Sequence, residues 1–159
     1  MFDFTFHNPT KIIFGAGKET LIGAELHGAG ITRILLVYGR NSVVRSGLLD
    51  RVLTSLKAAD ITCTQFGGVV SNPLLSHTRE GVALAKREKV EAILAVGGGS
   101  VLDEAKAIAV GAMSDTDVWQ FFLDREVERA LPIFTILTLA ATGSEMNGNS
   151  VIKIGRAHV

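Results

Sequence analysis

The sequence predicts an α/β fold with a doubly wound, mostly parallel sheet. Two continuous apolar runs, residues 34–38 and 92–96, are typical of strands that are buried on both faces of a parallel sheet. Segments with helical spacing of apolar residues alternate with these runs, which favours helices on both faces and right-handed crossovers. The 159 residues match the size of one domain, which we expect to span residues 1–155.

The expected elements follow one another in the order that this fold requires. The first half of the chain predicts a short strand, a helix, a buried strand and an amphipathic helix over residues 11–14, 19–27, 34–38 and 43–58. The second half predicts strands over residues 61–66, 92–96 and 131–137, and helices over residues 75–87, from Ser100 onward, and over 118–122. We expect Gly67-Gly68 to form a turn after the strand at 61–66, and Asn72-Pro73 to lie in a loop.

Composition excludes several classes of partner and location. The 16 basic residues balance the 16 acidic ones, so we expect no nucleic-acid partner and no attraction to an anionic membrane. The single cysteine, Cys63, excludes an internal disulfide, fits a reducing compartment and is expected to be a small buried hydrophobic residue. The N-terminus lacks the pattern of a signal peptide, and charges interrupt every long apolar run. These features predict a cytoplasmic location.

The central motif lies at residues 95–106, where a buried apolar run ends in three glycines and a helix begins at Ser100. Without Cβ atoms, residues 97–99 let the backbone turn sharply and let a ligand approach its N–H groups. The positive end of the helix dipole favours an anion at the same point. We interpret the motif as a cradle for the phosphates of a nucleotide. It is neither G-x-G-x-x-G, because Leu102 replaces the last glycine, nor a P-loop.

A second interpretation of Ser100 stays open beside the first. Ser100 and Asp103 have the spacing of a capping box, in which each side chain satisfies a backbone donor of the first helical turn. Capping and phosphate binding can coexist at this position.

Two further polar turns follow predicted strands, at residues 39–42 and 138–145. The carboxyl ends of parallel strands meet at one edge of a sheet, so these turns would line one cleft with the glycine motif. The hydroxyls of Thr138, Thr142 and Ser144 can hold a phosphate or a carboxamide without carrying charge. Considered singly, these three residues are ordinary turn formers.

Together these motifs resemble the iron-containing alcohol dehydrogenase family. The resemblance rests on Phe14-Gly15, Asn72-Pro73, the stretch 97–106 and the stretch 137–145, and it covers nearly the whole chain. The sequence is most similar to the butanol dehydrogenase and NADPH-dependent aldehyde reductase branch. Glycerol dehydrogenase and dehydroquinate synthase share the glycine turn, but the match at 138–145 argues against them. The resemblance implies a Rossmann-like dinucleotide-binding domain, followed in the family by a helical domain that carries iron or zinc.

The resemblance also implies which residues hold the cofactor. The pyrophosphate would lie on Gly97, Gly98, Gly99 and Ser100. Asp103 would lie near the nicotinamide, and Thr138 and Thr142 would contact the cofactor from the opposite wall, in the turn that also contains Ser144. The metal ligands of the family, one aspartate and three histidines, belong to the helical domain and have no counterpart here. We therefore assign no metal ligand and no catalytic residue to this chain.

The turn after the strand at 34–38 discriminates between the two nicotinamide cofactors. An acidic residue at this position would accept a hydrogen bond from the ribose 2′-hydroxyl and would repel a 2′-phosphate. Gly39 stands there instead, followed by Arg40, Asn41 and Ser42, which offer positive charge and hydrogen-bond donors. We therefore expect NADP(H) to be preferred over NAD(H). The alternative is an exposed turn before a helix that Ser42 caps.

We expect the NAD(P)(H)-binding domain of a metal-dependent enzyme that transfers hydride between NADPH and an aldehyde or primary alcohol. The whole enzyme would be a homodimer with iron or zinc in its helical domain. Residues 156–159 do not resemble the family's continuation, so we expect a foreign tail on a chain without the helical domain. A catalytically inactive nucleotide-binding fragment is the alternative, and a sugar-phosphate-binding regulatory domain is a third reading. The ligand that raises the melting temperature would separate the third reading from the others.

Overall fold

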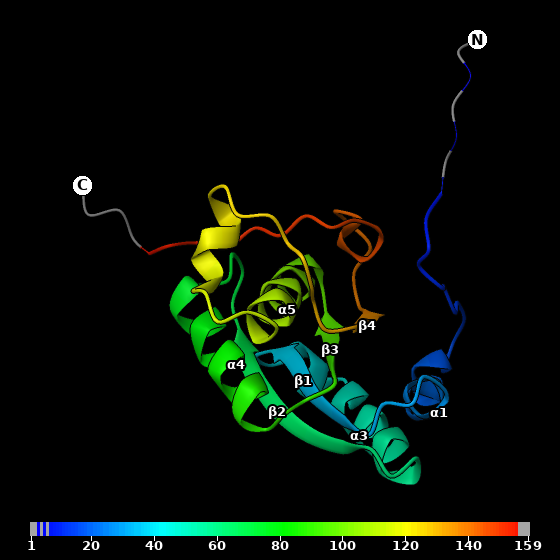
Figure 1. Ribbon diagram of the computed structural model, residues 1–159. Coiled ribbons are helices and arrows are strands. Elements are labelled where there is room, and N and C mark those ends of the chain that lie inside the picture. The colour runs from blue at the N-terminus through cyan, green and yellow to red at the C-terminus, as the bar shows by residue number, and fades with distance from the viewer. Residues whose placement is uncertain (1–2, 4, 6, 156–159) are drawn as a thin grey trace.

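Four parallel strands form one sheet in the order β2-β1-β3-β4 (Figure 1). The computed structural model describes residues 3, 5 and 7–155. The strands are β1 (Arg33–Gly39), β2 (Thr62–Val69), β3 (Ala92–Gly97) and β4 (Ile133–Leu137). Every pairing between neighbouring strands is parallel, which confirms the predicted α/β class.

Helices cover both faces of this sheet (Figure 1). Alternate residues of a strand point to opposite faces, so each face of β1 has its own core. Ile34 and Leu36 pack with residues of α1 (Ile22–Gly28) and α3 (Leu48–Ala58). Leu35 and Val37 pack instead with residues of α4 (Leu75–Arg87) and α5 (Gly99–Ala112). Burial of β1 and β3 on both faces explains why their sequences are continuous apolar runs.

The register of the strands brings three loops to one edge of the sheet. Tyr38 of β1 lies opposite Val96 of β3, and Gly97 of β3 lies opposite Leu137 of β4. The strands therefore end at nearly the same level, and the segments that follow β1, β3 and β4 leave the sheet side by side. This confirms the expectation that the three polar turns share one edge.

Three predictions of local structure were wrong. Residues 11–14 form no strand, because no strand of the described chain pairs with them; Phe14 is 95% exposed. The helix expected over 43–58 is divided into α2 (Ser42–Arg45) and α3, since Gly47 adopts a left-handed φ of 68° between them. The turn expected at Gly67-Gly68 lies inside β2. A Cβ on Gly67 would stand 2.6 Å from Cζ of Tyr38, so Gly67 lets the two strands pair beneath that ring.

The remaining helices lie where the sequence predicts them, although some of them are of the 3-10 type. Helix α4 has the predicted bounds, 75–87. The first helix begins as a 3-10 turn, η1 (Lys18–Leu21), before α1, and the short helix at η2 (Val118–Phe122) is also of the 3-10 type. A further 3-10 turn, η3 (Ser144–Met146), follows β4.

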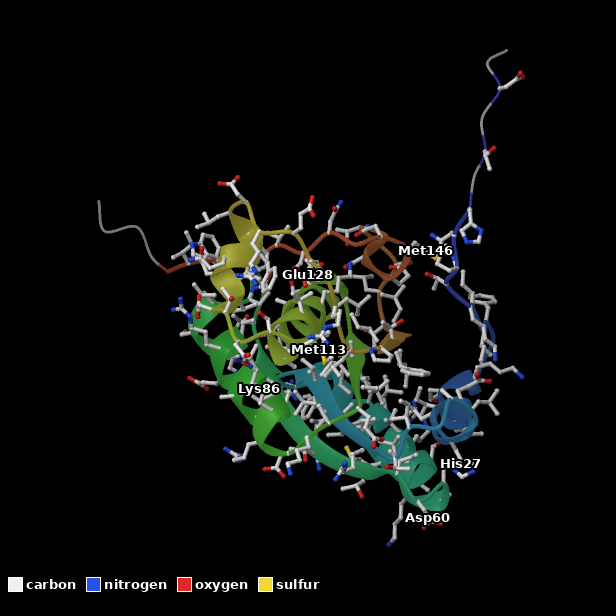
Figure 2. All side chains as sticks on the ribbon, viewed as in Figure 1. His27, Asp60, Lys86, Met113, Glu128 and Met146 are labelled. Atoms are coloured by element: carbon white, nitrogen blue, oxygen red, sulfur yellow. The ribbon has the colours of Figure 1, made fainter. Side chains whose placement is uncertain are left out.

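Residues 7–14 form no helix or strand and lie outside the sheet (Figure 1). They contact the segment after β4, where Asn8 Nδ2 donates a hydrogen bond to the carbonyl oxygen of Met146 at 3.0 Å. Met146 is labelled in Figure 2. The tail expected at 156–159 lies outside the described residues. Across the described chain, every helix is too short or too polar to cross a lipid bilayer.

Candidate dinucleotide site

The glycine turn leaves three backbone donors open at the start of α5. Gly98 precedes the helix in an extended conformation, and its carbonyl oxygen accepts bonds from the amides of Val101 and Leu102 at 3.0 and 3.2 Å. The amides of Gly98, Gly99 and Ser100 make no hydrogen bond within the described part of the chain. The first amides of an α-helix have no partner inside the helix, so they can bind an anion together with the positive end of the dipole.

Each of the three glycines has a different reason to be glycine. A Cβ on Gly97 would lie 2.6 Å from Cγ2 of Val101, so packing of α5 on β3 requires this residue. A Cβ on Gly99 would lie 2.8 Å from Oγ1 of Thr142. At Gly98 the nearest atom, Cβ of Leu139, would be 3.9 Å away, and the backbone conformation suits any residue. Packing within the protein therefore does not require a glycine at position 98. We interpret Gly98 as a residue that keeps the space beside the open amides free for a ligand.

The segment after β4 forms the opposite wall of the glycine turn. The amide of Thr138 donates to the carbonyl oxygen of Gly97 at 3.0 Å, which extends the pairing of β3 with β4 by one step. Thr142 then places its hydroxyl next to Gly99. Both threonines are exposed, and their hydroxyls make no hydrogen bond within the described residues. The structure thus brings together the glycine turn and two of the three hydroxyl residues that the sequence singled out.

Ser144 and Asp103, which were also expected at the cofactor, bond to one another. Ser144 is 4% exposed, and its hydroxyl donates to Oδ1 of Asp103 at 2.6 Å. Oδ2 of Asp103 accepts the amide of Val151 at 3.2 Å. The capping box expected for Ser100 and Asp103 is wrong, because α5 has no side-chain cap and the carboxylate faces the segment after β4. Direct contact of Ser144 and Asp103 with a cofactor stays a prediction, and their polar atoms are already used within the protein.

The turn after β1 lies beside the same helix start. A Cβ on Gly39 would stand 4.0 Å from Cγ2 of Val101, the side chain that also covers Gly97. Arg40, Asn41 and Ser42 are exposed, and their side chains make no hydrogen bond or ion pair within the described chain. Ser42 is the first residue of α2 and makes no capping bond, so the alternative role as a helix cap is wrong.

A buried pair that the sequence analysis missed lies between α4 and α5. Glu104 is fully buried, and its Oε1 is 2.7 Å from Nδ1 of His77 and 3.3 Å from Oγ1 of Thr78. Removal from water raises the pKa of the Glu104 carboxyl group, whereas the contact with His77 acts in the opposite direction. The signal was present in the sequence: Glu104 falls on the same helical stripe as Val101, Ala105 and Ile108.

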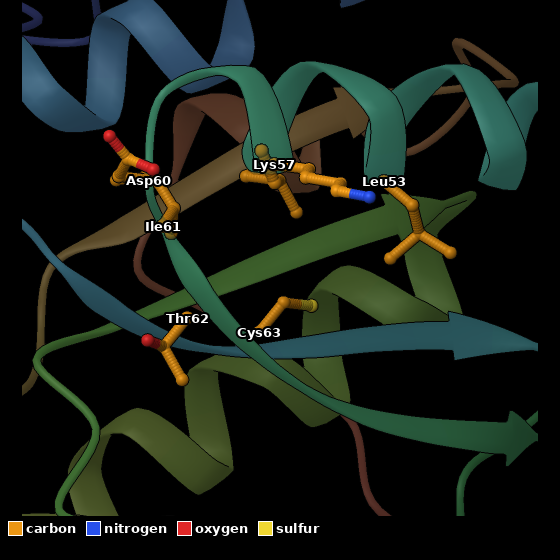
Figure 3. A pocket seen from close by; sticks show the side chains of 7 residues that line it. Leu53, Lys57, Asp60, Ile61, Thr62 and Cys63 are labelled. Atoms are coloured by element: carbon orange, nitrogen blue, oxygen red, sulfur yellow. The ribbon is translucent and has the colours of Figure 1, made fainter.

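A surface depression lies at the other end of the sheet. It has a volume of about 390 Å³ and is lined by residues of α3 and by the start of β2, among them Lys57, Thr62 and Cys63 (Figure 3). Because the polar turns lie at the carboxyl ends of the strands, we do not assign this depression to the dinucleotide site. Cys63 is half-buried against the α3 face of the core, and burial raises its pKa to about 11.

The described residues form no cluster of side chains suited to a metal centre. Across these residues, His, Cys, Asp and Glu side chains form no group of three or more that could hold a metal ion. The residues present therefore do not fit the iron or zinc centre that the resemblance implies for the whole enzyme.

Comparison with known proteins agrees with the resemblance. A sequence profile described as iron-containing alcohol dehydrogenase matches residues 9–159. The chain is 48% identical over 153 residues to the probable NADH-dependent butanol dehydrogenase 1 of Bacillus subtilis strain 168, covering 96% of this chain and 39% of that protein. It is 41% identical over 158 residues to the NADPH-dependent aldehyde reductase YqhD of Escherichia coli K12, covering 96% of this chain and 40% of that protein.

A solved structure has the same fold. The crystal structure of NADH-dependent butanol dehydrogenase A from Thermotoga maritima matches with a TM-score of 0.93 at 51% sequence identity. The match covers 96% of this chain and 38% of that one. Among the curated relatives, this chain spans 39% of the length of the Bacillus subtilis protein and 40% of the length of the Escherichia coli protein.

Proposed function

We propose a function from one premise: this chain belongs to the iron-containing alcohol dehydrogenase family. We infer that it forms the part of an alcohol dehydrogenase or aldehyde reductase that binds the nicotinamide cofactor. One observation carries the proposal. Three open amides at the start of α5 face the edge of the sheet where the segments after β1 and β4 also emerge. A doubly charged pyrophosphate is the group for which such an arrangement is suited.

In this proposal, the amides of Gly98, Gly99 and Ser100 hold the pyrophosphate, and Gly97 lets α5 begin close to β3. The hydroxyls of Thr138 and Thr142 bind the cofactor from the other wall, since both are exposed and unused. When bound, the nicotinamide supplies or accepts the hydride. The residues of this chain bind and orient it.

We further propose that the cofactor is NADP(H) in preference to NAD(H). Gly39 has no carboxylate that could accept a hydrogen bond from a ribose 2′-hydroxyl. The next residue, Arg40, has an exposed guanidinium group that can bind a 2′-phosphate. The relatives include both kinds, an NADH-dependent butanol dehydrogenase and an NADPH-dependent aldehyde reductase. The proposal therefore rests on the residues of this turn.

The substrates that we propose for the whole protein are aldehydes and primary alcohols. A homodimeric assembly of the whole enzyme stays a prediction. Since the described residues do not fit a metal centre, we assign this chain cofactor binding and no metal ligand. We accordingly expect the chain by itself to oxidise NADPH no faster than a protein-free control when butanal and iron or zinc are supplied. A metal-dependent rate above that control would refute this assignment.

The test of the proposal is a titration of the chain with NADPH and NADH, followed by calorimetry or by nicotinamide fluorescence. The decisive variant is Gly98→Ala, whose methyl group would fit the fold but would stand beside the open amides. We expect it to weaken binding roughly tenfold or more, which corresponds to the loss of one or two charge-assisted hydrogen bonds.

The matched control is Gly28→Ala, because Gly28 also has open space around its Cβ position and lies at the end of α1, outside the glycine turn and the segment after β4. This variant should bind cofactor as the wild type does. The proposal fails if the wild type binds neither cofactor, or if Gly98→Ala binds with unchanged affinity.

A further inference from the structure

Lys106, one turn after Asp103 on α5, makes three hydrogen bonds to the segment that follows β4. Its Nζ lies 2.8 Å from Oγ of Ser144, 3.3 Å from Oδ1 of Asn147 and 2.7 Å from the carbonyl oxygen of Asn149. An ammonium group has three protons, so these acceptors use all of them. Lys106 therefore has no proton left for a phosphate.

The direction of every bond in this cluster follows from the chemistry. A charged lysine can only donate, so the hydroxyl oxygen of Ser144 accepts from Lys106. The same hydroxyl must then donate its own proton, and Oδ1 of Asp103 is at 2.6 Å to accept it. Ser144 is thus a bridge between a cation and an anion on one face of α5. Its near-complete burial protects these bonds from water.

Two more bonds tie the same segment to Asp103. Its Oδ2 accepts the amide of Val151 at 3.2 Å, and its carbonyl oxygen accepts the hydroxyl of Ser150 at 2.7 Å. We call residues 138–151 the threonine loop. The loop is held to α5 at 144 and again at 147–151, beyond Thr142 in each case. These attachments restrict where Thr142 can lie relative to Gly99.

We propose that Asp103 and Lys106 are positioning residues that hold the threonine loop against α5, so that the hydroxyl of Thr142 stays beside Gly99 at the phosphate site. The inference rests on the proposed cofactor function and adds a role to it. Asp103 and Lys106 raise the affinity for the cofactor through the loop, without touching the cofactor themselves. Without these attachments, the loop would become ordered only when the cofactor binds. The conformational entropy lost in that step would weaken binding.

Alternative roles for the two residues fit the contacts less well. A lysine in a motif that follows three glycines is expected to bind phosphate as a point charge. Here the ammonium group is half-buried and fully used, and it faces the loop. Asp103 carries a negative charge, which would repel the pyrophosphate if it lay at that site.

The experiment compares Lys106→Met, which removes the three donors and keeps most of the apolar stem, with Ser144→Ala, which removes the bridge. Lys153→Met is the control, because Lys153 is exposed and its side chain makes no hydrogen bond within the described residues. Hydrogen exchange of the loop amides is measured without cofactor, and the dissociation constant for NADPH is measured for each variant. A double-mutant cycle adds Thr142→Val, which removes the hydroxyl at the phosphate site.

We expect faster exchange over residues 138–151 in Lys106→Met and Ser144→Ala, and affinities that fall roughly threefold to tenfold. Once Thr142→Val is present, Lys106→Met should cost no further affinity, because both act through one hydroxyl. Lys153→Met should change neither quantity. Unchanged exchange in the loop overturns the proposal, and so does an additive double-mutant cycle, which would mean that Lys106 touches the cofactor. If the wild type binds neither cofactor, the proposed function fails, whereas the exchange result still decides the positioning role.

Discussion

The buried Glu104 should make the stability of the chain fall as pH rises, and Glu104→Gln should remove that dependence. Oε1 of Glu104 contacts His77 and Thr78, whereas its buried Oε2 has no hydrogen-bond partner among the described residues. Desolvation is the main cause that raises the pKa of Glu104, and the nearby Glu80 carboxylate adds to it. The folded chain therefore holds this proton more tightly than the unfolded chain does.

The sign of the effect follows from proton linkage. Below the unfolded pKa both states are protonated, and the favourable neutral form is fully present in the fold. As pH rises through the raised folded pKa, the unfolded state has already lost its proton, and folding stability falls. One group changes the free energy of unfolding by at most about 1.4 kcal/mol per pH unit in this window. Glutamine keeps the shape of the side chain and cannot ionise, so any offset that it introduces is independent of pH.

The assay is urea denaturation of both proteins at a series of values from about pH 4, near the ordinary pKa of a glutamate, to about pH 8. The stability of Glu104→Gln relative to the wild type should rise with pH. The exposed Glu128→Gln is the matched control, and its difference from the wild type should stay flat. A difference between Glu104→Gln and the wild type that is equally flat would refute the account of Glu104 as a desolvated acid.

Three other outcomes are expected. Gly97→Ala should destabilise the fold by about 1–3 kcal/mol in denaturant, because its methyl group would overlap Val101. A cost no larger than that of Gly28→Ala would contradict this packing. Arg40→Ala should reduce the ratio of NADPH to NADH affinity roughly tenfold in paired titrations. Arg45→Ala, at an exposed arginine of α2, should leave that ratio unchanged, and an equal loss for both cofactors in Arg40→Ala would rule out a 2′-phosphate contact. Cys63, with its pKa raised to about 11, should react with iodoacetamide near neutral pH much more slowly than free cysteine, and labelling at the rate of free cysteine would show that the thiol is not shielded.

Much of the fold could be predicted because its signals are local. Burial on both faces produces the apolar runs at 34–38 and 92–96, and helical spacing marks α4 to its last residue. The parallel order follows from the alternation of these elements, and parallel strands bring their carboxyl ends to one edge. The sequence therefore determined that the glycine turn and the loops after β1 and β4 meet. These loops carry most of the candidate site.

Tertiary structure alone decided how side chains distant in sequence pair with one another. The carboxylate of Asp103 accepts a hydrogen bond from Ser144, which is 41 positions away in the sequence. Glu104 contacts His77, which is 27 positions away. The spacing of Ser100 and Asp103 favours a capping box, but the carboxylate of Asp103 bonds instead to partners from the far end of the chain. The β-branched residues at 11–14 could form a strand only with a neighbouring strand, and the described fold places none beside them. Periodicity and backbone freedom are properties of a short segment, whereas a hydrogen bond between distant segments depends on the packing of the whole chain.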